Sequence, residues 1–387
     1  MKINSKLSSI KKRFSLSFPI NSNDSQLPFL FLKYSLIFPA LLYGNSALAA
    51  PDDLFLQAQN LNSQRDTWSI QASADGLNDT IDIFNLRDED KNPNGTGDYL
   101  GGTFEAHYNL NSQFSIEGKY WHREIDYAND TNKMDSWLVG IRYIPEVFSN
   151  DSDTFSLRAS VWGNIADELK KDTPTIINDR RFEQIQVNNA KDLQLQLDGI
   201  FSHRINSTNQ LNAFASVGYS KVEVDSLDTQ LNYNGCLASV SIQSNNQFTG
   251  SLSPLCRSFA ISGDASAFGL DLNQDLNYKA TYASAGGSWN WRYHKFESQL
   301  AYQYQYLWRQ DIDDRIENFG TSTIKDNHRI GLKLSYDFLP RLSGFIQAQY
   351  VEHNFIGTIP FLYNGITLSR LDDHYGYASI GLKLHSF

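Results

Sequence analysis

Charged side chains occupy every second position in several segments of this 387-residue chain. In residues 114–127, for example, Glu117, Lys119 and Arg123 alternate with apolar residues and glycine. Only a β-strand turns a period of two into two distinct faces, so each such segment would carry its charges on one face. If the strands close into a barrel, these faces meet inside it, where clustered Arg and Lys side chains favour anions. The spacing therefore indicates solute binding in a lumen.

The candidate lumen-lining residues all lie on the polar face of their segments. They are Lys119, Arg123, Arg142, Arg158, Arg309, Arg329, Lys333, Lys383, Glu117 and Glu297. Basic residues outnumber acidic ones, which predicts a net positive lining. Trp121, Trp162 and Tyr377 on the same face would suit hydroxyl-rich solutes. A second interpretation stays open, because inward Arg and Glu side chains often pair across neighbouring strands and contact no solute.

Catalysis needs a nucleophile, a histidine base and an orienting group that converge. Two of the eight histidines, His122 and His328, are expected near the outer rim on the apolar face, but neither falls in a recognisable Ser/His arrangement. We therefore expect no catalytic residues, no metal site and no cofactor. A lipid hydrolase is therefore the least favoured function.

The two cysteines, Cys236 and Cys256, lie 20 residues apart in one polar segment. In an exported protein, an isolated pair at this spacing predicts a disulfide bond. Closing a loop of this size would stabilise the fold by about 3 kcal/mol on the chain-entropy model.

The composition is rich in strand-forming aromatic residues, with 20 Tyr, 24 Phe and 7 Trp. Twelve alternating segments predict twelve strands. They span residues 67–75, 99–110, 114–127, 134–144, 154–165, 192–205, 210–224, 276–292, 296–309, 327–338, 344–353 and 375–385, and residues 80–83 are a candidate extension of the first. No stretch of residues 50–387 has the roughly 18 apolar residues of a membrane helix. A membrane location would therefore require a closed β-barrel.

The last segment, HYGYASIGLKLHSF, alternates small or apolar residues with polar ones and ends on Phe387. This amphipathic strand resembles the C-terminal signature of bacterial outer-membrane β-barrel proteins. The resemblance implies a bacterial outer-membrane location, contact with outer-membrane lipid and lipopolysaccharide, and recognition of the C-terminal strand by the barrel-assembly machinery. The apolar positions are out of step with Phe387, which predicts a bulge between Leu384 and Phe387.

The connections alternate between short and long, as in an outer-membrane barrel. The long ones are residues 84–98, 128–133, 166–191, 225–275, 310–326 and 354–373. The fold class is therefore all-β, a transmembrane antiparallel up-and-down barrel of about 12 strands, or 14 if residues 225–275 hold two more. Aromatic residues near the short turns predict an interfacial girdle, which argues against a soluble all-β fold: Trp68, Tyr108, Tyr143, Trp289, Trp291 and Tyr336.

Residues 1–49 combine basic residues, a short apolar run and an A-x-A site, which predicts a secretory signal peptide. Residues 50–66 would form a short periplasmic segment and 67–387 the barrel. The leader holds six basic residues and one acidic residue, so the mature chain carries about −15 instead of the −10 of the whole chain. That charge disfavours nucleic acid as a partner.

Two functions remain in view for such a barrel. Its size and lumenal charge resemble those of narrow porin-like channels, which implies passive passage of small anionic or sugar-like solutes. The architecture also resembles a solitary autotransporter-type barrel, which implies a surface or assembly role without conductance. The sequence leaves open whether residues 225–275 fold into the lumen.

Overall fold

The computed structural model describes twelve stretches of the chain, all within one compact unit, Ser46–Phe387. They are residues 54–58, 67–77, 99–127, 130–171, 174–177, 180–233, 236–252, 260–268, 271–318, 322–353, 357–364 and 375–386. The predicted signal peptide, residues 80–83 and Cys256 lie outside them.

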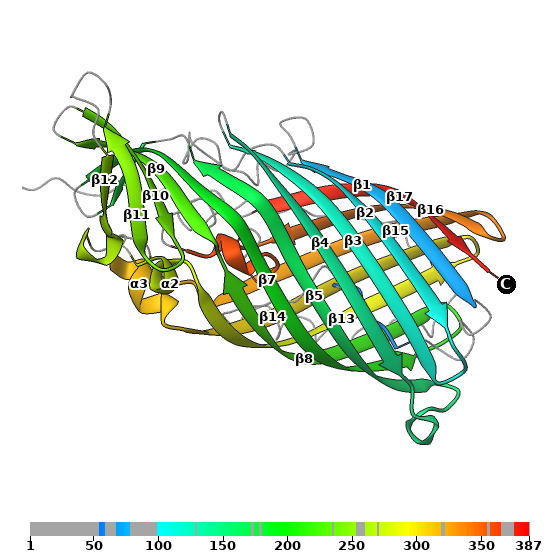
Figure 1. Ribbon diagram of the computed structural model, residues 1–387. Coiled ribbons are helices and arrows are strands. Elements are labelled where there is room, and N and C mark those ends of the chain that lie inside the picture. Colours follow the sequence, from blue (N-terminus) through cyan, green and yellow to red (C-terminus); the bar gives the residue numbers. More distant parts are fainter. Residues whose placement is uncertain are drawn as a thin grey trace, which may run out of the picture. The chain divides into compact units, whose positions relative to one another are not determined.

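Twelve antiparallel strands form a closed ring, which confirms the predicted barrel (Figure 1). The ring consists of β1 (Trp68–Leu77), β2 (Tyr99–Asn109), β3 (Phe114–Tyr127), β4 (Asp130–Tyr143), β5 (Asp153–Lys171), β7 (Arg180–Arg204), β8 (Asn209–Glu223), β13 (Tyr278–Tyr293), β14 (Phe296–Gln310), β15 (Asp326–Leu339), β16 (Leu342–Val351) and β17 (Tyr375–His385). Each strand pairs with the next one in this order, β8 pairs with β13, and β17 returns to β1. Each predicted strand thus coincides with one strand of the ring.

The barrel buries its polar faces and exposes its apolar ones over most of its length. On β8, Leu211 and Val217 are 42% and 58% exposed, whereas Asn212 and Ser216 are buried at 5% and 3%. The six aromatic residues predicted for the girdle also point outward, close to the short turns. This distribution is the reverse of that in a water-soluble fold.

The sidedness reverses toward the long-loop end of the strands. On β3, the outward residues change from Ile116 and Tyr120 to His122 and Glu124, and inward Ile125 is buried. Here charged residues face out and apolar ones face in, as in a soluble protein. The step from Tyr120 to His122 on β3 therefore marks one edge of a belt of outward-facing apolar residues, which we call the apolar belt.

Strand β7 makes the same change through its backbone. Leu193 and Leu195 are exposed, but Ile185 and Val187 are buried, although all four occupy odd positions. The change coincides with Asn189, whose φ of 51° lies in the left-handed region. Apolar residues therefore stay at odd positions along the strand, but they face inward before Asn189 and outward after it.

Among the described residues, five further strands lie outside the ring. They are β6 (Thr175–Ile177), β9 (Ser226–Tyr233), β10 (Cys236–Gln243), β11 (Gln247–Leu252) and β12 (Ala260–Asp264). Strand β9 pairs with the long-loop end of β7, and β10, β11 and β12 follow in order. The alternative of fourteen barrel strands is therefore wrong, because these strands extend the sheet above the ring instead of entering it. Much of the loop predicted at residues 166–191 is also strand, since β5 and β7 continue pairing there.

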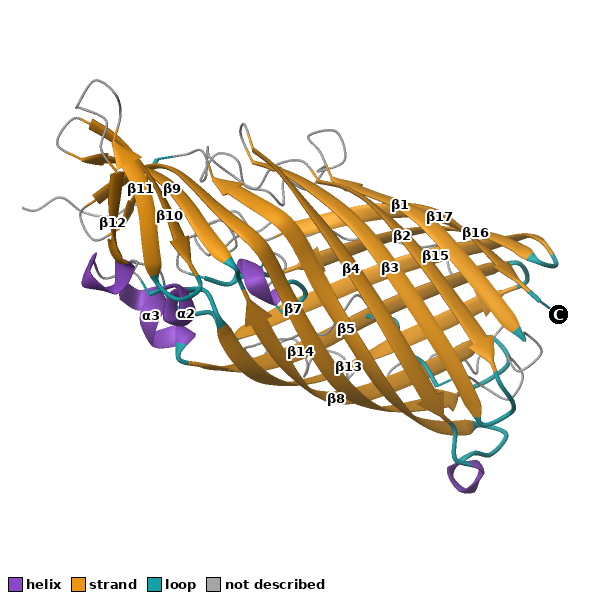
Figure 2. Ribbon diagram, in the orientation of Figure 1, coloured by secondary structure: helices purple, strands orange, loops and turns teal. Residues whose placement is uncertain are grey.

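Helical elements are few and short among the described residues (Figure 2). They are η3 (Glu146–Phe148), η5 (Ala265–Phe268), α2 (Leu272–Asp275), α3 (Ile312–Asn318) and η6 (Pro360–Leu362). Within the described stretches, no helix has the length and apolar character needed to cross a membrane.

The seam between β1 and β17 is regularly paired from Gly76↔Ala378 to Ser69↔His385. The Ser386 amide then donates to the Trp68 carbonyl at 2.9 Å. Pairing thus shows no bulge through His385, and Phe387 lies outside the described residues, so any irregularity is confined to the last two positions.

Candidate functional site

The lumen contains three layers, and the ten candidate residues lie in them or beside them. A turn-side cavity of about 670 Å³ reaches the short-turn rim at Asn206 and Asn209. A layer of paired arginines lies beside its inner end. The long-loop end is filled by what we call the cap: residues 357–364, α2, α3 and the inward apolar residues of the upper strands.

Lysines and amides line one wall of the turn-side cavity. Lys119 lies 4.0 Å from Glu105, and Lys333 Nζ donates to Gln71 Oε1 at 3.1 Å. Lys383 lines the same cavity, as do Glu117 and Glu297. Glu297 accepts a bond from Gln299 Nε2 at 2.9 Å and lies 3.8 Å from Arg292 Nε.

Residues 54–58 lie inside the barrel. Leu54 and Ala58 are 0% and 1% exposed, and the Ala58 amide donates to Ser202 Oγ at 2.9 Å. Asn290 Nδ2 donates to Gln57 Oε1 at 2.6 Å. These are the only described residues of the predicted periplasmic segment, and they fill part of the lumen.

The arginine layer centres on Arg158. Its Nη1 donates to Asp198 Oδ2 at 2.9 Å and its Nε donates to Glu117. Both Arg158 and Asp198 are at most 1% exposed. Arg142 Nη2 lies 3.9 Å from Glu117, and Arg142 also donates to the Gln57 carbonyl. Carboxylates or backbone carbonyls therefore bind these basic residues. This agrees with the interpretation that inward Arg and Glu side chains pair with each other across the strands.

The other three arginines hold the upper lumen together. Arg123 donates to Ser136 Oγ at 2.6 Å. Arg309 Nη1 lies 3.6 Å from Asp313 and stacks 3.5 Å over the Tyr363 ring. Arg329 Nη2 donates to Thr358 Oγ1 at 2.6 Å. None of the three lines the turn-side cavity.

Several neutral polar groups of the lumen are buried without partners among the residues that the structure describes. Gln303 and Gln305 are 0% exposed, and neither amide has a hydrogen-bond partner among the described residues. Ser216 and Ser284 lie opposite each other on β8 and β13, and their hydroxyl groups also have no hydrogen-bond partner among the described residues. A buried polar group without a bond costs about 1–3 kcal/mol, so we expect water molecules to bond these groups.

Residues 357–364 close the upper lumen. Asn164 Nδ2 donates to the Thr358 carbonyl at 3.0 Å, and Tyr278 Oη donates to the Pro360 carbonyl at 2.6 Å. Three side chains of the loop are at most 7% exposed and pack into the apolar cluster of the cap: Ile359, Phe361 and Leu362.

Two ionisable groups of the cap are tuned by burial. Burial raises the pKa of Tyr363 well above its ordinary value, so the phenol stays neutral and donates to Asp313 Oδ1 at 2.9 Å. Burial also raises the pKa of Asp275, which lies 3.7 Å from Arg315 Nη1. The cap is therefore a folded structure with its own core and ion pairs.

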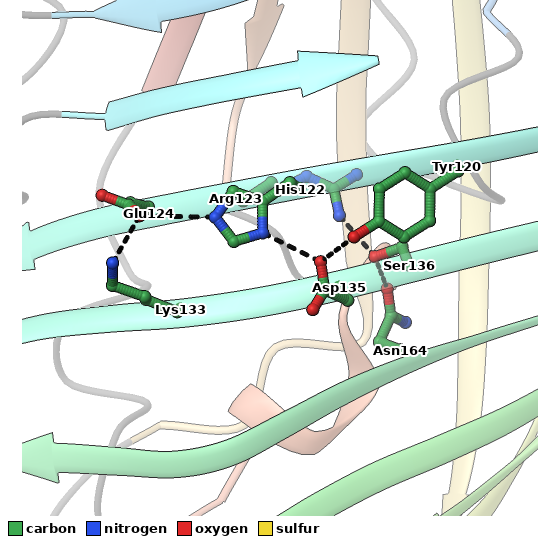
Figure 3. Close-up of polar contacts among 8 residues, drawn as sticks. All are labelled: Tyr120, His122, Arg123, Glu124, Lys133, Asp135, Ser136 and Asn164. Carbon is green, nitrogen blue, oxygen red and sulfur yellow. Dashed lines mark hydrogen bonds and ion pairs between the residues drawn. The ribbon is translucent and has the colours of Figure 1, made fainter. Parts of the chain in front are cut away.

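A histidine–carboxylate cluster lies on the outer surface, just beyond the apolar belt (Figure 3). His122 Nδ1 is 2.8 Å from Asp135 Oδ1 and its Nε2 is 3.3 Å from Glu124 Oε1. Tyr120 Oη donates to the same Asp135 oxygen at 2.5 Å. Because carboxylates engage both ring nitrogens, His122 is not placed as a base for a hydroxyl nucleophile. At His328, the Tyr302 hydroxyl lies 2.8 Å from Nδ1 and Glu352 lies 3.4 Å from Nε2.

Figure 3 also shows how the strands separate the two faces. Arg123, Ser136 and Asn164 form a hydrogen-bonded row inside the barrel, one residue away from the exterior cluster. The row continues through Asn164 to Asp192 at 2.9 Å. Sequence reasoning found Arg123 by its position, but it did not find the row, because Ser and Asn on separate strands give no local signal.

No protein-family model and no curated protein sequence matches the chain. Among solved structures, the translocator domain of the autotransporter NalP from Neisseria meningitidis is 8% identical, with 92% of this chain and 94% of that chain covered and a TM-score of 0.44. The β-domain of the Bordetella autotransporter BrkA is 10% identical, with 83% and 98% covered and a TM-score of 0.41.

The KdgM porin is 7% identical, with 82% of this chain and 99% of that chain covered and a TM-score of 0.33. These identities are 10% or lower and these TM-scores are below 0.5. The function of this chain therefore has to be argued from its own residues.

Proposed function

We propose that the protein spans the bacterial outer membrane as a narrow channel for small anionic or sugar-like solutes, closed at its outer end in the resting state. The exposed apolar belt supports the membrane location. On β8 the belt runs from Leu211 to Tyr219, eight steps of about 3.3 Å or about 26 Å along the strand; at the roughly 35–45° tilt of such barrels this covers about 19–22 Å across the membrane, close to their roughly 25 Å apolar band. The reversal of sidedness beyond Tyr120 supports an aqueous phase above it.

The polar turn-side cavity is the observation that carries the channel function. A barrel that only displays a surface has no need of a cavity of about 670 Å³ lined by lysines and amides. The unpartnered amides of Gln303 and Gln305 continue this polar lining toward the cap. Solute entering from the short-turn rim would thus meet polar groups up to residues 357–364.

The cap argues against a permanently open pore. Exposing Ile359, Phe361 and Leu362 to water would cost about 5–9 kcal/mol at 1.5–3 kcal/mol each. At 1.4 kcal/mol per factor of ten, fewer than about one molecule in a thousand would be open at any moment. Conductance therefore requires displacement of the cap.

Planar-bilayer recording of the full chain tests this function. We expect rare openings from the wild type, and frequent anion-preferring openings after residues 357–364 are replaced by eight Gly and Ser residues. A control variant, Val147→Ser/Phe148→Ser, changes an exposed turn on the opposite rim and should conduct like the wild type. A replacement variant that folds, shown by a heat-modifiable band on gels, and yet stays silent or prefers cations would refute the channel.

A solitary surface barrel without conductance is the second candidate. The extension formed by β9–β12 favours it, since this sheet carries an exposed face of hydroxyl groups from Ser239, Thr249, Ser251 and Ser262. A silent but folded replacement variant would support this role.

A further inference from the structure

We infer that Lys119, Lys333 and Lys383 form a binding site for a compact dianion, a phosphate or phosphate monoester, in the turn-side cavity. The inference deepens the proposed channel function by naming a solute class, but binding itself does not require conductance. All three lysines line the cavity of about 670 Å³ and come from separate strands, β3, β15 and β17.

Strand register brings the three ammonium groups to one wall. Lys119 pairs with Glu105, Glu105 with Gln71, and Gln71 with Lys383, which gives one row across β3, β2, β1 and β17. Lys333 reaches this row from β15, since its Nζ donates to Gln71 Oε1 at 3.1 Å. The site thus surrounds the Gln71 amide.

The local charge is positive because only one carboxylate belongs to the row. Glu105 lies 4.0 Å from Lys119, whereas Lys333 and Lys383 form no ion pair with any residue that the structure describes. Three lysines against Glu105 leave this row net positive, which suits an anion, and Glu297, another carboxylate of the cavity, lies 3.8 Å from Arg292. The arginine layer differs, since Arg158 contacts two carboxylates.

The other carboxylates of the cavity already have partners. Glu117 is bound by Arg158, and Asp337 accepts from Arg292 at 3.0 Å and from Ser343 at 2.8 Å. Asp75 accepts from Thr103 Oγ1 at 2.7 Å and lies four residues along β1 from Gln71, about 13 Å away. The first two carboxylates are thus paired with arginine, and the third lies away from the lysines around Gln71.

Phosphate is favoured over a single carboxylate by the number and kind of donors. Lysine ammonium groups act as compact point charges with three donors each, and three of them around one volume suit a doubly charged tetrahedral group. The cavity is larger than phosphate alone, and Gln347 and Ser379 on the same wall can bond the hydroxyls of an attached sugar.

Calorimetric titration of the detergent-solubilised full chain at low salt tests the site. The probes are inorganic phosphate, glucose 6-phosphate, glucuronate and glucose. We expect both phosphates to bind, glucuronate to bind more weakly, and glucose not to bind. Lys383→Gln should weaken glucose 6-phosphate binding about tenfold or more, because a charge-assisted contact is lost.

Lys221→Gln is the matched control, because Lys221 is an exposed lysine paired with Glu223 outside the barrel. It should leave binding unchanged, and heat-modifiable bands should show that both variants fold. Glucose binding as tight as glucose 6-phosphate, or unchanged binding in folded Lys383→Gln, would overturn the site. Phosphate binding without conductance would retain the site and refute the channel, and conductance without phosphate binding would do the opposite.

Discussion

Arg158 is the charged residue of the lumen that depends most on its neighbours. Its guanidinium lies between Glu117 and Asp198, and neither Arg158 nor Asp198 contacts solvent. An isolated buried charge is much more expensive than a paired one, so the three groups stabilise the barrel only as a set.

Arg158→Met should therefore destabilise the barrel by about 3–5 kcal/mol, the usual effect of removing one partner from a buried pair. The measurement is the temperature at which the folded band disappears on unboiled gels. The double variant Arg158→Met/Asp198→Asn leaves Glu117 with Arg142 and should recover most of the loss. Equal destabilisation of the single and double variants would contradict this role.

Gly331 matters for the side chain it lacks. A Cβ atom built on it would lie 2.4 Å from Leu54 Cδ2 and 3.0 Å from the Phe55 ring, so the glycine leaves room for residues 54–58. Gly331→Val should expel that segment while the strands stay paired. A spin label at Gln57 should then change from immobile to mobile, whereas Gly102→Ala, whose nearest contact would be 3.6 Å, should leave it immobile. A label that stays immobile in folded Gly331→Val would refute the steric argument.

At the scale of elements, alternation predicted the ring because each of its strands is amphipathic across the belt. It could not show that β7 reverses its faces, because Ile185, Val187, Leu193 and Leu195 share one parity and the change depends on the backbone at Asn189. The extension was missed for a related reason. Strands β10, β11 and β12 are short and rich in Ser, Thr and Gly, so their pattern resembles that of a loop.

The candidate site was predicted in part. Position along each strand identified its lysines and arginines, but not which of them pair. Partners such as Gln57 for Arg142 and Thr358 for Arg329 come from segments far away in sequence that fold into the lumen. Such contacts depend on tertiary structure and leave no periodicity.

The predicted disulfide belongs to the extension, since Cys236 begins β10. We expect no reactive thiol in the denatured, unreduced protein, as measured by labelling and mass spectrometry. Double substitution of Cys236 and Cys256 by Ser should destabilise the extension by about 3 kcal/mol. Protease cleavage there should become faster, while the heat-modifiable transition of the barrel stays unchanged. Two labelled thiols in the unreduced protein would disprove the bond.

For the molecule as a whole, the belt predicts where a charge is tolerated. Val217 is 58% exposed at the middle of β8 and would face lipid. Val217→Arg should reduce folding stability in lipid vesicles by about 2–4 kcal/mol. Ser239→Arg, at an exposed position on the extension, should have little effect on denaturant unfolding measured the same way. Equal effects of both substitutions would argue against a transmembrane belt.

The two segments that fill the lumen flank the seam. Residues 54–58 precede β1, residues 357–364 precede β17, and these two strands close the ring. During assembly, an open sheet would hold both segments at its free edges, with its polar face still hydrated. Joining β17 to β1 would then draw both inward and displace the water whose place they take, in a single step. The last event of folding would thus be cooperative, and its rate would depend on residues that are not in the seam.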